Sequence, residues 1–136
     1  MPYDLEKFIS ESNRIEGITR DPTVAELDGA DHFLSRHVVS IVDLEDLVDS
    51  FYGPSIFLRD QVGRDVRVGD YFPPRGGPHI KTVLEALLDK ANKRRIDDYE
   101  LHVVYEQLHP FTDGNGRSGR LLWLWRRGGS TSAPLR

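Results

Sequence analysis

The residues best suited to chemistry lie together in one short stretch, residues 109–120, called here the signature segment. It reads His-Pro-Phe-Thr-Asp-Gly-Asn-Gly-Arg-Ser-Gly-Arg. His109 can act as a base that deprotonates an incoming hydroxyl, and Asp113 is a hard carboxylate of the kind that binds Mg²⁺. The backbone N–H groups of a glycine-rich turn that leads into a helix can bind an anion. The segment therefore suits a polyphosphate that carries a divalent metal.

Two arginines complete this segment. Arg117 and Arg120 are three residues apart, so they lie on the same face of a helix. Their charge-assisted hydrogen bonds can hold the terminal phosphates of a nucleotide. Base, carboxylate, glycine-rich turn and arginines together predict a reaction in which part of a nucleotide is transferred to a hydroxyl.

The signature segment resembles that of the Fic family, His-Pro-Phe-x-Asp/Glu-Gly-Asn-Gly-Arg-x-x-Arg, at every fixed position. A match of this length is far more specific than an isolated glycine pattern. Fic proteins typically transfer AMP from ATP to a Ser, Thr or Tyr hydroxyl of a target protein. The resemblance therefore implies a protein adenylyltransferase that uses ATP as co-substrate and Mg²⁺ as cofactor.

The resemblance also implies a role for each residue of the segment. His109 would be the general base and Asp113 the Mg²⁺ ligand. Phe111 would be the anchoring aromatic, which turns into the core and holds the loop in shape. The nucleotide contacts would be made by Gly114, Asn115 and Gly116 (the phosphate cradle) at the α-phosphate, Arg117 at the β-phosphate side and Arg120 at the γ-phosphate.

A second motif lies near the N-terminus, where residues 12–17 read Ser-Asn-Arg-Ile-Glu-Gly. They resemble the family's inhibitory motif, Ser/Thr-x-x-x-Glu-Gly/Asn. In Fic proteins with this motif before the core, its glutamate pairs with the second arginine of the signature. Ser12 and Glu16 would then be inhibitory residues, with Glu16 paired to Arg120. A carboxylate on this arginine removes the donor that a γ-phosphate requires. The alternative is a surface glutamate near a helix end.

A third region, residues 57–72, is similar to the family's flap, a hairpin that holds the target segment over the active site. Val66 and Val68 alternate with charged residues, and Gly63 and Gly69 can supply turns, so we expect a short exposed hairpin. An exposed strand edge can bind an extended peptide by adding a strand. An unknown target protein would therefore bind at the flap. The alternative is a connecting loop.

The rest of the chain predicts an all-α fold, a mainly helical Fic-type bundle with the short β-hairpin flap. An apolar stripe predicts a helix that begins near Asp97 or Asp98, and Pro110 places His109 at its end, with the ring free to face a cleft. Residues 121–125 are apolar nearly all round, as in a central, buried helix. The apolar stripes of the expected helices are Leu5, Phe8, Ile9 and Ser12; Leu44, Leu47, Val48 and Phe51; Ile80, Val83, Leu84, Leu87, Leu88 and Ala91; and Leu101, Val104, Tyr105 and Leu108.

Length and composition indicate one domain, because 136 residues with 38% hydrophobic content can bury a single core. We expect an N-terminal inhibitory region at 1–20, a Fic core with the flap at 21–127, and a disordered tail at 128–136. The small residues of that tail are typical of disorder.

Composition also excludes several classes of protein. The chain has no cysteine, so disulfides, thiolate chemistry and cysteine zinc sites are excluded. No apolar run reaches membrane-spanning length and no signal peptide is recognisable at the N-terminus, so we expect a cytoplasmic protein that does not enter a membrane. The net charge of −4 argues against broad nucleic-acid binding. The sequence leaves open whether the chain forms a homo-oligomer.

Three functions compete at this point. The first is an AMP transferase held inactive by Glu16. The second keeps the fold but changes the chemistry: the Doc branch of the superfamily transfers the γ-phosphate as a kinase, and removal of AMP from targets by the same loop is also open. The Doc branch has an altered Gly-Asn-Gly cradle, whereas this cradle is complete. The third is a non-catalytic nucleotide-binding or toxin–antitoxin module, which the retention of His109 argues against, because binding alone needs no base.

Overall fold

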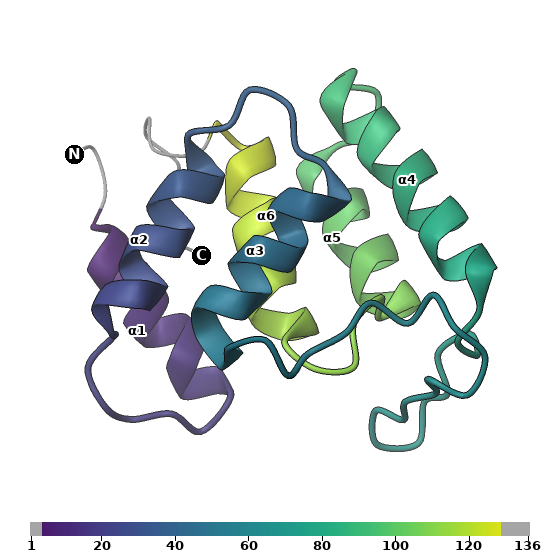
Figure 1. Cartoon of the computed structure of the whole chain (residues 1–136). Helices are drawn as coiled ribbons and strands as arrows, with labels where there is room; N and C mark the ends of the chain where they lie inside the picture. The colour runs from purple at the N-terminus through teal and green to yellow at the C-terminus, as the bar shows by residue number, and fades with distance from the viewer. Residues whose placement is uncertain (1–3, 129–136) are drawn as a thin grey trace.

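A central helix, α6, organises the structure, and most of the other helices pack directly against it (Figure 1). The computed structural model describes residues 4–128, which form six helices. Helix α6 contacts α1, α2, α3 and α5, whereas α4 packs outside them against α3 and α5. The all-α prediction and the central position of the last helix are confirmed. The helices are α1 (Leu5–Ile15), α2 (Val24–Leu34), α3 (Ile41–Tyr52), α4 (Pro78–Asn92), α5 (Asp98–Leu108) and α6 (Asn115–Arg126).

The helices begin in two different ways. Four of them start at a side chain that accepts a hydrogen bond from the backbone N–H three residues later, which satisfies an otherwise unpaired donor of the first turn. Helices α4 and α6 instead follow Gly77 and Gly114 and have no side-chain cap. The N–H groups that begin α6 are therefore left for another acceptor. The capping residues of α1, α2, α3 and α5 are Asp4, Thr23, Ser40 and Asp97.

The expected apolar stripes face one shared core, with one exception. Leu101, Tyr105 and Leu108 of α5 are buried as predicted, and Val104 is partly buried. The prediction for Val83 is wrong, because its side chain is 43% exposed. Helix α4 is an outer helix with neighbours on one side only, so its buried stripe is narrower than that of α6.

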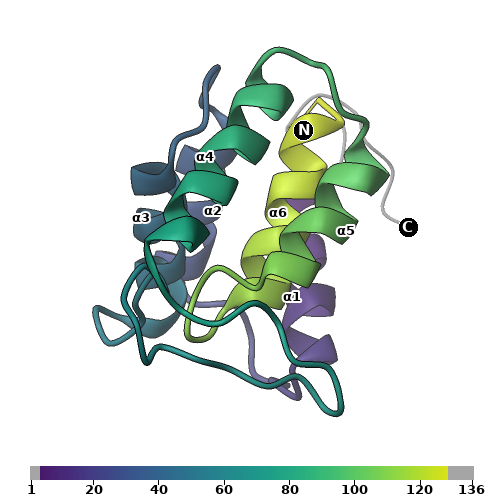
Figure 2. The same ribbon diagram turned by 90° about the vertical axis from the view of Figure 1, so that its right-hand side faces the viewer.

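The long connection between α3 and α4 crosses one end of the bundle and passes close to the loop between α5 and α6 (Figure 2). Of the hairpin expected at residues 57–72, only a tight turn near the end of the segment is present. Val68 and Tyr71 form one antiparallel bridge with hydrogen bonds of 2.9 and 2.8 Å around a two-residue turn. The short hairpin expected over residues 57–72 is therefore limited to residues 68–71.

The flap lacks a longer ladder because arginine side chains bind its backbone carbonyls. Arg59 donates to the carbonyl oxygens of Arg64 and Pro74, and Arg64 donates to that of Leu58. These oxygens would otherwise be available to a partner strand. The interior of the flap is thus held by side chain–backbone contacts, whereas its first residues pair with the backbone of the signature segment.

A buried ion pair connects α2 with α6. Glu26 and Arg117 are 1% and 2% exposed, and Nη1 of Arg117 donates to Glu26 Oε2 and to Asn13 Oδ1, both at 2.9 Å. The same guanidinium lies over the rings of Phe51 and Tyr52, 4.7 and 4.6 Å from their centroids. One side chain of α6 thus contacts α1, α2 and α3.

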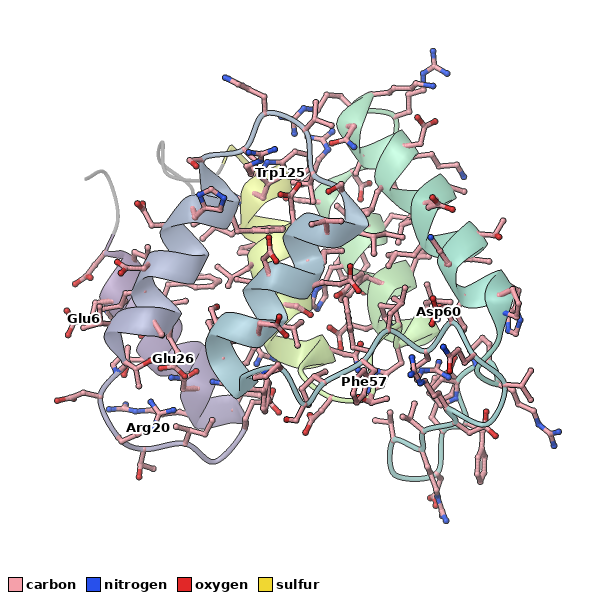
Figure 3. The ribbon with its side chains drawn as sticks, viewed as in Figure 1. Glu6, Arg20, Glu26, Phe57, Asp60 and Trp125 are labelled. Carbon is pink, nitrogen blue, oxygen red and sulfur yellow. The ribbon has the colours of Figure 1, made fainter. Side chains whose placement is uncertain are left out.

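Glu26 is well provided with donors. Its carboxylate also accepts two hydrogen bonds from Arg20, at 3.0 and 3.1 Å, and one from the backbone N–H of Thr23 at 2.8 Å (Figure 3). Burial alone would raise the pKa of Glu26, but these hydrogen bonds and the charges of Arg20 and Arg117 lower it to about 2. The carboxylate therefore stays ionised in the interior.

This environment predicts a large effect of Glu26→Gln. We expect the variant to lose about 3–5 kcal/mol of unfolding free energy at pH 7, because it leaves the buried Arg117 charge without a counter-charge. The pKa of Glu26 is lower in the folded state than its usual value of 4.5. Its stabilisation is therefore complete above that value and disappears as the pH falls toward 2. Urea unfolding of the parent and of Glu26→Gln between pH 7 and pH 3 should show that their difference in unfolding free energy becomes smaller as the pH falls.

The control is Glu6→Gln, which removes an exposed carboxylate from the first turn of α1. We expect it to change the unfolding free energy by less than about 1 kcal/mol. Equal losses in the two variants would contradict the buried-pair interpretation.

Candidate active site

His109 ends α5 in a left-handed backbone conformation, with φ 51° and ψ 62°. This conformation is uncommon for a residue other than glycine and costs on the order of 1–3 kcal/mol. Pro110 disfavours a helical conformation for the residue before it, as the sequence predicted. The helix therefore ends at this histidine.

The hydrogen bond of the imidazole defines which nitrogen can act as the base. Nδ1 of His109 lies 3.2 Å from the backbone oxygen of Glu106, and a carbonyl can only accept. Nδ1 is therefore the donor, and in the neutral ring Nε2 holds the free lone pair. Burial lowers the pKa of His109, as does the charge of Arg59, which favours this neutral form near pH 7.

Phe111 and Asn115 hold the signature segment in shape. Phe111 is buried, as predicted for an anchor. The side-chain amide of Asn115 accepts from the Phe111 N–H and donates to the Phe111 carbonyl, both at 2.9 Å. The Asn115 side chain is thus committed to the loop, so any contact of this residue with a phosphate would be made by its backbone N–H.

The phosphate cradle lies at the uncapped N-terminus of α6. Gly114 precedes the helix with φ 79°, a conformation that favours glycine. The first N–H groups of a helix have no partner within the helix and point outward at its positive end. A Cβ on Gly116 would lie 2.6 Å from Glu16 Oε2 and 3.1 Å from Arg120 Nη1, so a larger residue at this position would require that pair to shift. The uncapped N–H groups at the start of α6 therefore form a site suited to an anion.

Asp113 is exposed at the edge of this cradle. One of its oxygens accepts the Gly114 N–H at 2.7 Å. Within residues 4–128 no group of three acidic or histidine side chains could hold a metal by itself. Mg²⁺ commonly binds through one or two carboxylates together with substrate phosphates and water. A single exposed carboxylate beside an anion site fits that mode of binding.

The structure brings Ser12, Glu16 and Arg120 together as the N-terminal motif predicted. Arg120 Nη2 lies 2.7 Å from Glu16 Oε2, its Nε donates to Ser12 Oγ at 2.7 Å, and Nη2 also donates to the Ser12 carbonyl at 3.1 Å. Arg120 remains 21% exposed. The apolar residues of α1 insert into the core and hold this helix against α6.

Arg117 is not where its predicted role would place it. It was expected to share a nucleotide-facing surface with Arg120, but its guanidinium is buried against Glu26 and Asn13. The contact with the β-phosphate side remains a prediction. What the structure assigns to this arginine is the attachment of α1 and α2 to α6.

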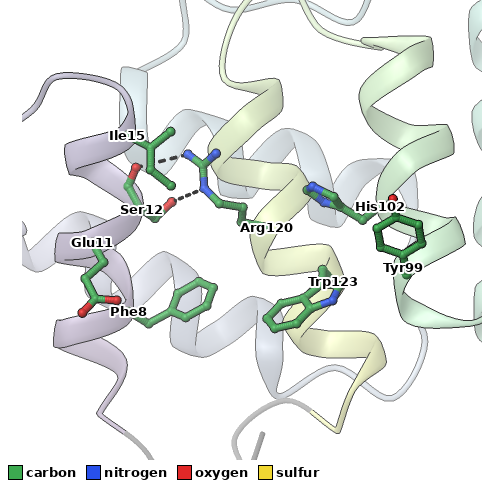
Figure 4. A pocket seen from close by; sticks show the side chains of 8 residues that line it. All are labelled: Phe8, Glu11, Ser12, Ile15, Tyr99, His102, Arg120 and Trp123. Carbon is green, nitrogen blue, oxygen red and sulfur yellow. Dashed lines mark hydrogen bonds between the residues drawn. The ribbon is translucent and has the colours of Figure 1, made fainter. Parts of the chain in front are cut away.

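A cavity of about 240 Å³ extends along α6 from Arg120, away from the phosphate cradle (Figure 4). Helices α1, α5 and α6 form its walls. The Ser12–Arg120 hydrogen bonds lie at its edge, so the cavity borders the contact between α1 and Arg120. Its lining residues are Phe8, Glu11, Ser12, Ile15, Tyr99, His102, Arg120 and Trp123.

Glu106 is a site residue that the sequence did not indicate. It lies on α5 one turn before His109, and within the described residues its buried Oε1 has no hydrogen-bond partner. The carboxyl packs against Gly119, where a Cβ would collide with Oε1. Burial raises the pKa of Glu106 to about 7, the charge of Glu16 adds to this, and Arg120 opposes it. Its position three residues before His109 was the available signal, but a lone glutamate on a helix gives no reason to suspect burial.

The comparison with protein families agrees with this geometry. The model of the Fic/DOC family matches residues 33–125, more than half of the chain and all of the signature segment. The chain therefore belongs to the Fic/DOC family. No curated protein and no solved structure gave a match. Helix α1 and its inhibitory motif lie outside the matched range. None of the helices within residues 4–128 combines the length and the apolar character needed to cross a membrane.

The buried carboxyl of Glu106 predicts a pH dependence opposite to that of Glu26. Its pKa of about 7 in the folded state lies above the usual 4.5, so the folded state binds this proton more tightly and stability falls as the pH rises between these values. Glutamine cannot ionise, so the variant lacks this loss. We expect the unfolding free energy of Glu106→Gln, compared with that of the parent, to be about 2 kcal/mol higher at pH 8 than at pH 5. Urea unfolding at the two pH values measures this gain.

Glu85→Gln is the matched control, because Glu85 is exposed on the outer helix α4. Its unfolding free energy should follow that of the parent at both pH values. If Glu106→Gln also follows the parent, then Glu106 ionises normally in the folded protein.

Proposed function

We propose that this protein is an adenylyltransferase that transfers AMP from ATP to a Ser, Thr or Tyr hydroxyl of a target protein, and that Glu16 inhibits it by occupying Arg120. The observation that supports the reaction best is the short loop between α5 and α6. There, His109 with a free Nε2 lone pair lies next to the uncapped N-terminus of α6. Members of the Fic/DOC family generally transfer nucleotidyl or phosphoryl groups, which agrees with this chemistry.

The proposed reaction assigns one bond change to each group. Nε2 of His109 takes the proton from the target hydroxyl, whose oxygen forms a bond to the α-phosphorus of ATP. The bond between this phosphorus and the bridging oxygen breaks, and pyrophosphate leaves. The N–H groups that begin α6 hold the α-phosphate in line for attack, and positioning of this kind accounts for much of phosphoryl-transfer catalysis. Mg²⁺ held by Asp113 would neutralise charge on the phosphate oxygens.

Inhibition follows from the contact between Glu16 and Arg120. While the 2.7 Å pair is present, the γ-phosphate has no free arginine to bind. ATP must then displace Glu16 or bind with a misplaced γ-phosphate, which turns the α-phosphorus away from the attacking hydroxyl. Because Arg120 and Glu16 are both partly exposed, this pair can exchange far more easily than the buried pair of Glu26 and Arg117.

The role of His109 is tested by His109→Ala. Because the base acts on the hydroxyl and not on ATP, we expect AMP transfer to fall by a factor of about a hundred to ten thousand while the Kd for Mg·ATP stays nearly constant. Transfer is measured with α-labelled ATP, and binding by calorimetry. Retention of more than half of the transfer rate would refute the assignment.

The inhibitory role is tested by Glu16→Gly, assayed as α-labelled AMP on the protein itself or on a lysate target. Loss of one charge-assisted hydrogen bond should raise activity roughly tenfold to a hundredfold. The control is Glu11→Gly, which changes the same helix without touching Arg120. Equal activation in both variants would mean that loosening of α1, and not release of Arg120, controls the rate.

A parallel assay with γ-labelled ATP separates the remaining functions. Transfer of the γ-label would indicate a kinase of the Doc type, and transfer of neither label by the Glu16→Gly variant would favour a non-catalytic module. Loss of label from a previously modified target would indicate removal of AMP.

A further inference from the structure

Arg59 is the largest completely buried side chain in the described part of the structure, with 0% of its surface exposed. Buried arginines are usually paired with a carboxylate. This guanidinium instead donates hydrogen bonds to backbone carbonyls, and the negative charge of Asp65 partly offsets the effect of burial on its pKa. Four hydrogen bonds from one buried side chain to backbone carbonyls indicate that Arg59 does more than fill the interior.

The carbonyls that Arg59 binds belong to two different regions. Its Nε donates to the His109 carbonyl at 2.6 Å and its Nη2 to the Leu108 carbonyl at 2.8 Å, both at the C-terminal end of α5. Its Nη1 donates to the carbonyl of Arg64 within the flap, at 3.0 Å, and to that of Pro74 just after it, at 2.8 Å. A single side chain therefore joins the flap to the backbone of His109.

These contacts fix both peptide groups of the histidine. The N–H of His109 donates to the Tyr105 carbonyl at 3.0 Å, which holds the peptide group before it. The carbonyl of His109 is held by Arg59, which fixes the peptide group after it. The backbone around His109 is left-handed, so without these two restraints it would have reason to relax. The imidazole can then move only about its two side-chain torsions, χ1 and χ2, which the hydrogen bond to Glu106 restrains.

Backbone pairing next to Arg59 makes the connection continuous. Its own N–H donates to the Pro110 carbonyl at 2.8 Å, and the Thr112 N–H donates to the Phe57 carbonyl at 2.9 Å. Leu58 forms a bridge with Phe111 between these two bonds. Residues 57–59, at the start of the flap, thus lie antiparallel to residues 110–112 of the signature segment and pair with them.

We propose that Arg59 is a positioning residue for His109: it holds the His109 carbonyl so that the imidazole is correctly placed, and it connects this placement to the flap. The inference rests on the proposed function, because it takes His109 to be the general base. Arg59 contacts neither the phosphate cradle nor any atom of the reaction. Its effect should therefore appear in the rate of the chemical step and not in ATP binding.

The charge of Arg59 provides a second readout. Burial lowers the pKa of His109, the hydrogen bond to the Glu106 carbonyl raises it, and the positive charge of Arg59 lowers it. The negative charges that face the imidazole are Asp113 in the signature segment and Glu16 on α1, and both raise its pKa. Removing the positive charge while leaving the others in place should raise the pKa of His109.

The test compares Arg59→Met and Arg59→Lys, each combined with Glu16→Gly so that activity is measurable. We expect Arg59→Met to lower kcat by roughly a hundredfold, the effect of a small misplacement of a catalytic group, while the KM for ATP changes by less than about twofold. Lysine keeps the charge but reaches fewer carbonyls, so Arg59→Lys should retain an intermediate kcat. Arg126→Met is the control: its Nε donates to the Ile96 carbonyl at 2.9 Å, far from the signature segment, and kcat should be unchanged.

A histidine titration by NMR, without nucleotide, tests the same contact independently of activity. The His109 signal is the one absent from His109→Ala. Its pKa should rise in Arg59→Met and stay close to the parent value in Arg59→Lys. If these shifts occur but no variant transfers AMP, then the proposed function is wrong and the positioning contact stands.

Two outcomes would overturn the inference. One is an unchanged kcat in Arg59→Lys and Arg59→Met with an unchanged His109 titration. The other is a parallel loss of stability and kcat in Arg59→Met and Arg126→Met, which would make Arg59 a structural residue only. If Arg59→Met does not fold, then Arg59→Lys decides the question: a reduced kcat at constant KM supports positioning, and parent kinetics refute it.

Discussion

The buried ion pair between Glu26 and Arg117 is the contact on which the arrangement of the site depends. It holds α2 against α6, the helix whose N-terminus forms the phosphate cradle, and Asn13 attaches α1 to the same arginine. Desolvating two charges is expensive, and the cost is offset only because the carboxylate has further donors in Arg20 and Thr23. Once this pair is formed, α1 lies where Glu16 meets Arg120. The contact of Glu16 with Arg120 at the surface is therefore a consequence of a structural contact in the interior.

The two arginines of the signature segment differ in burial and therefore in the contacts that they can make. Arg117 faces α1, α2 and α3 and has permanent partners, whereas Arg120 lies closer to solvent and has a partner that can leave. On the opposite side, Arg59 attaches the same loop to the flap. Buried guanidinium groups thus fix both ends of this region: Arg59 holds the end of α5, and Arg117 holds the first turn of α6. Such rigidity agrees with the proposed reaction, in which the site aligns a phosphorus atom with a hydroxyl.

Much of this structure could be predicted from local sequence. Capping residues and apolar periodicity define the helices, and the two motifs identify Phe111, His109 and the contact of Glu16 with Arg120. The sequence could not show that Arg117 turns inward, because its partner Asn13 is 104 residues away and helical periodicity says nothing about which neighbour a face meets. Arg59 and Glu106 were missed for the same reason. The flap was overestimated because a short alternation of residue types cannot reveal that side chains will take the carbonyls of a ladder.

The close fit of Glu106 against Gly119 has a consequence for the evolution of this protein. Two adjacent helices share one small volume, which the carboxyl of Glu106 fills only because position 119 has no Cβ. A relative with alanine or serine at position 119 would have to turn the side chain at position 106 aside, carry a shorter one there, or move the helices apart next to the loop between α5 and α6. The two positions should therefore covary across homologues, so that their identities mark a lineage in which a buried acid lies beside Arg120.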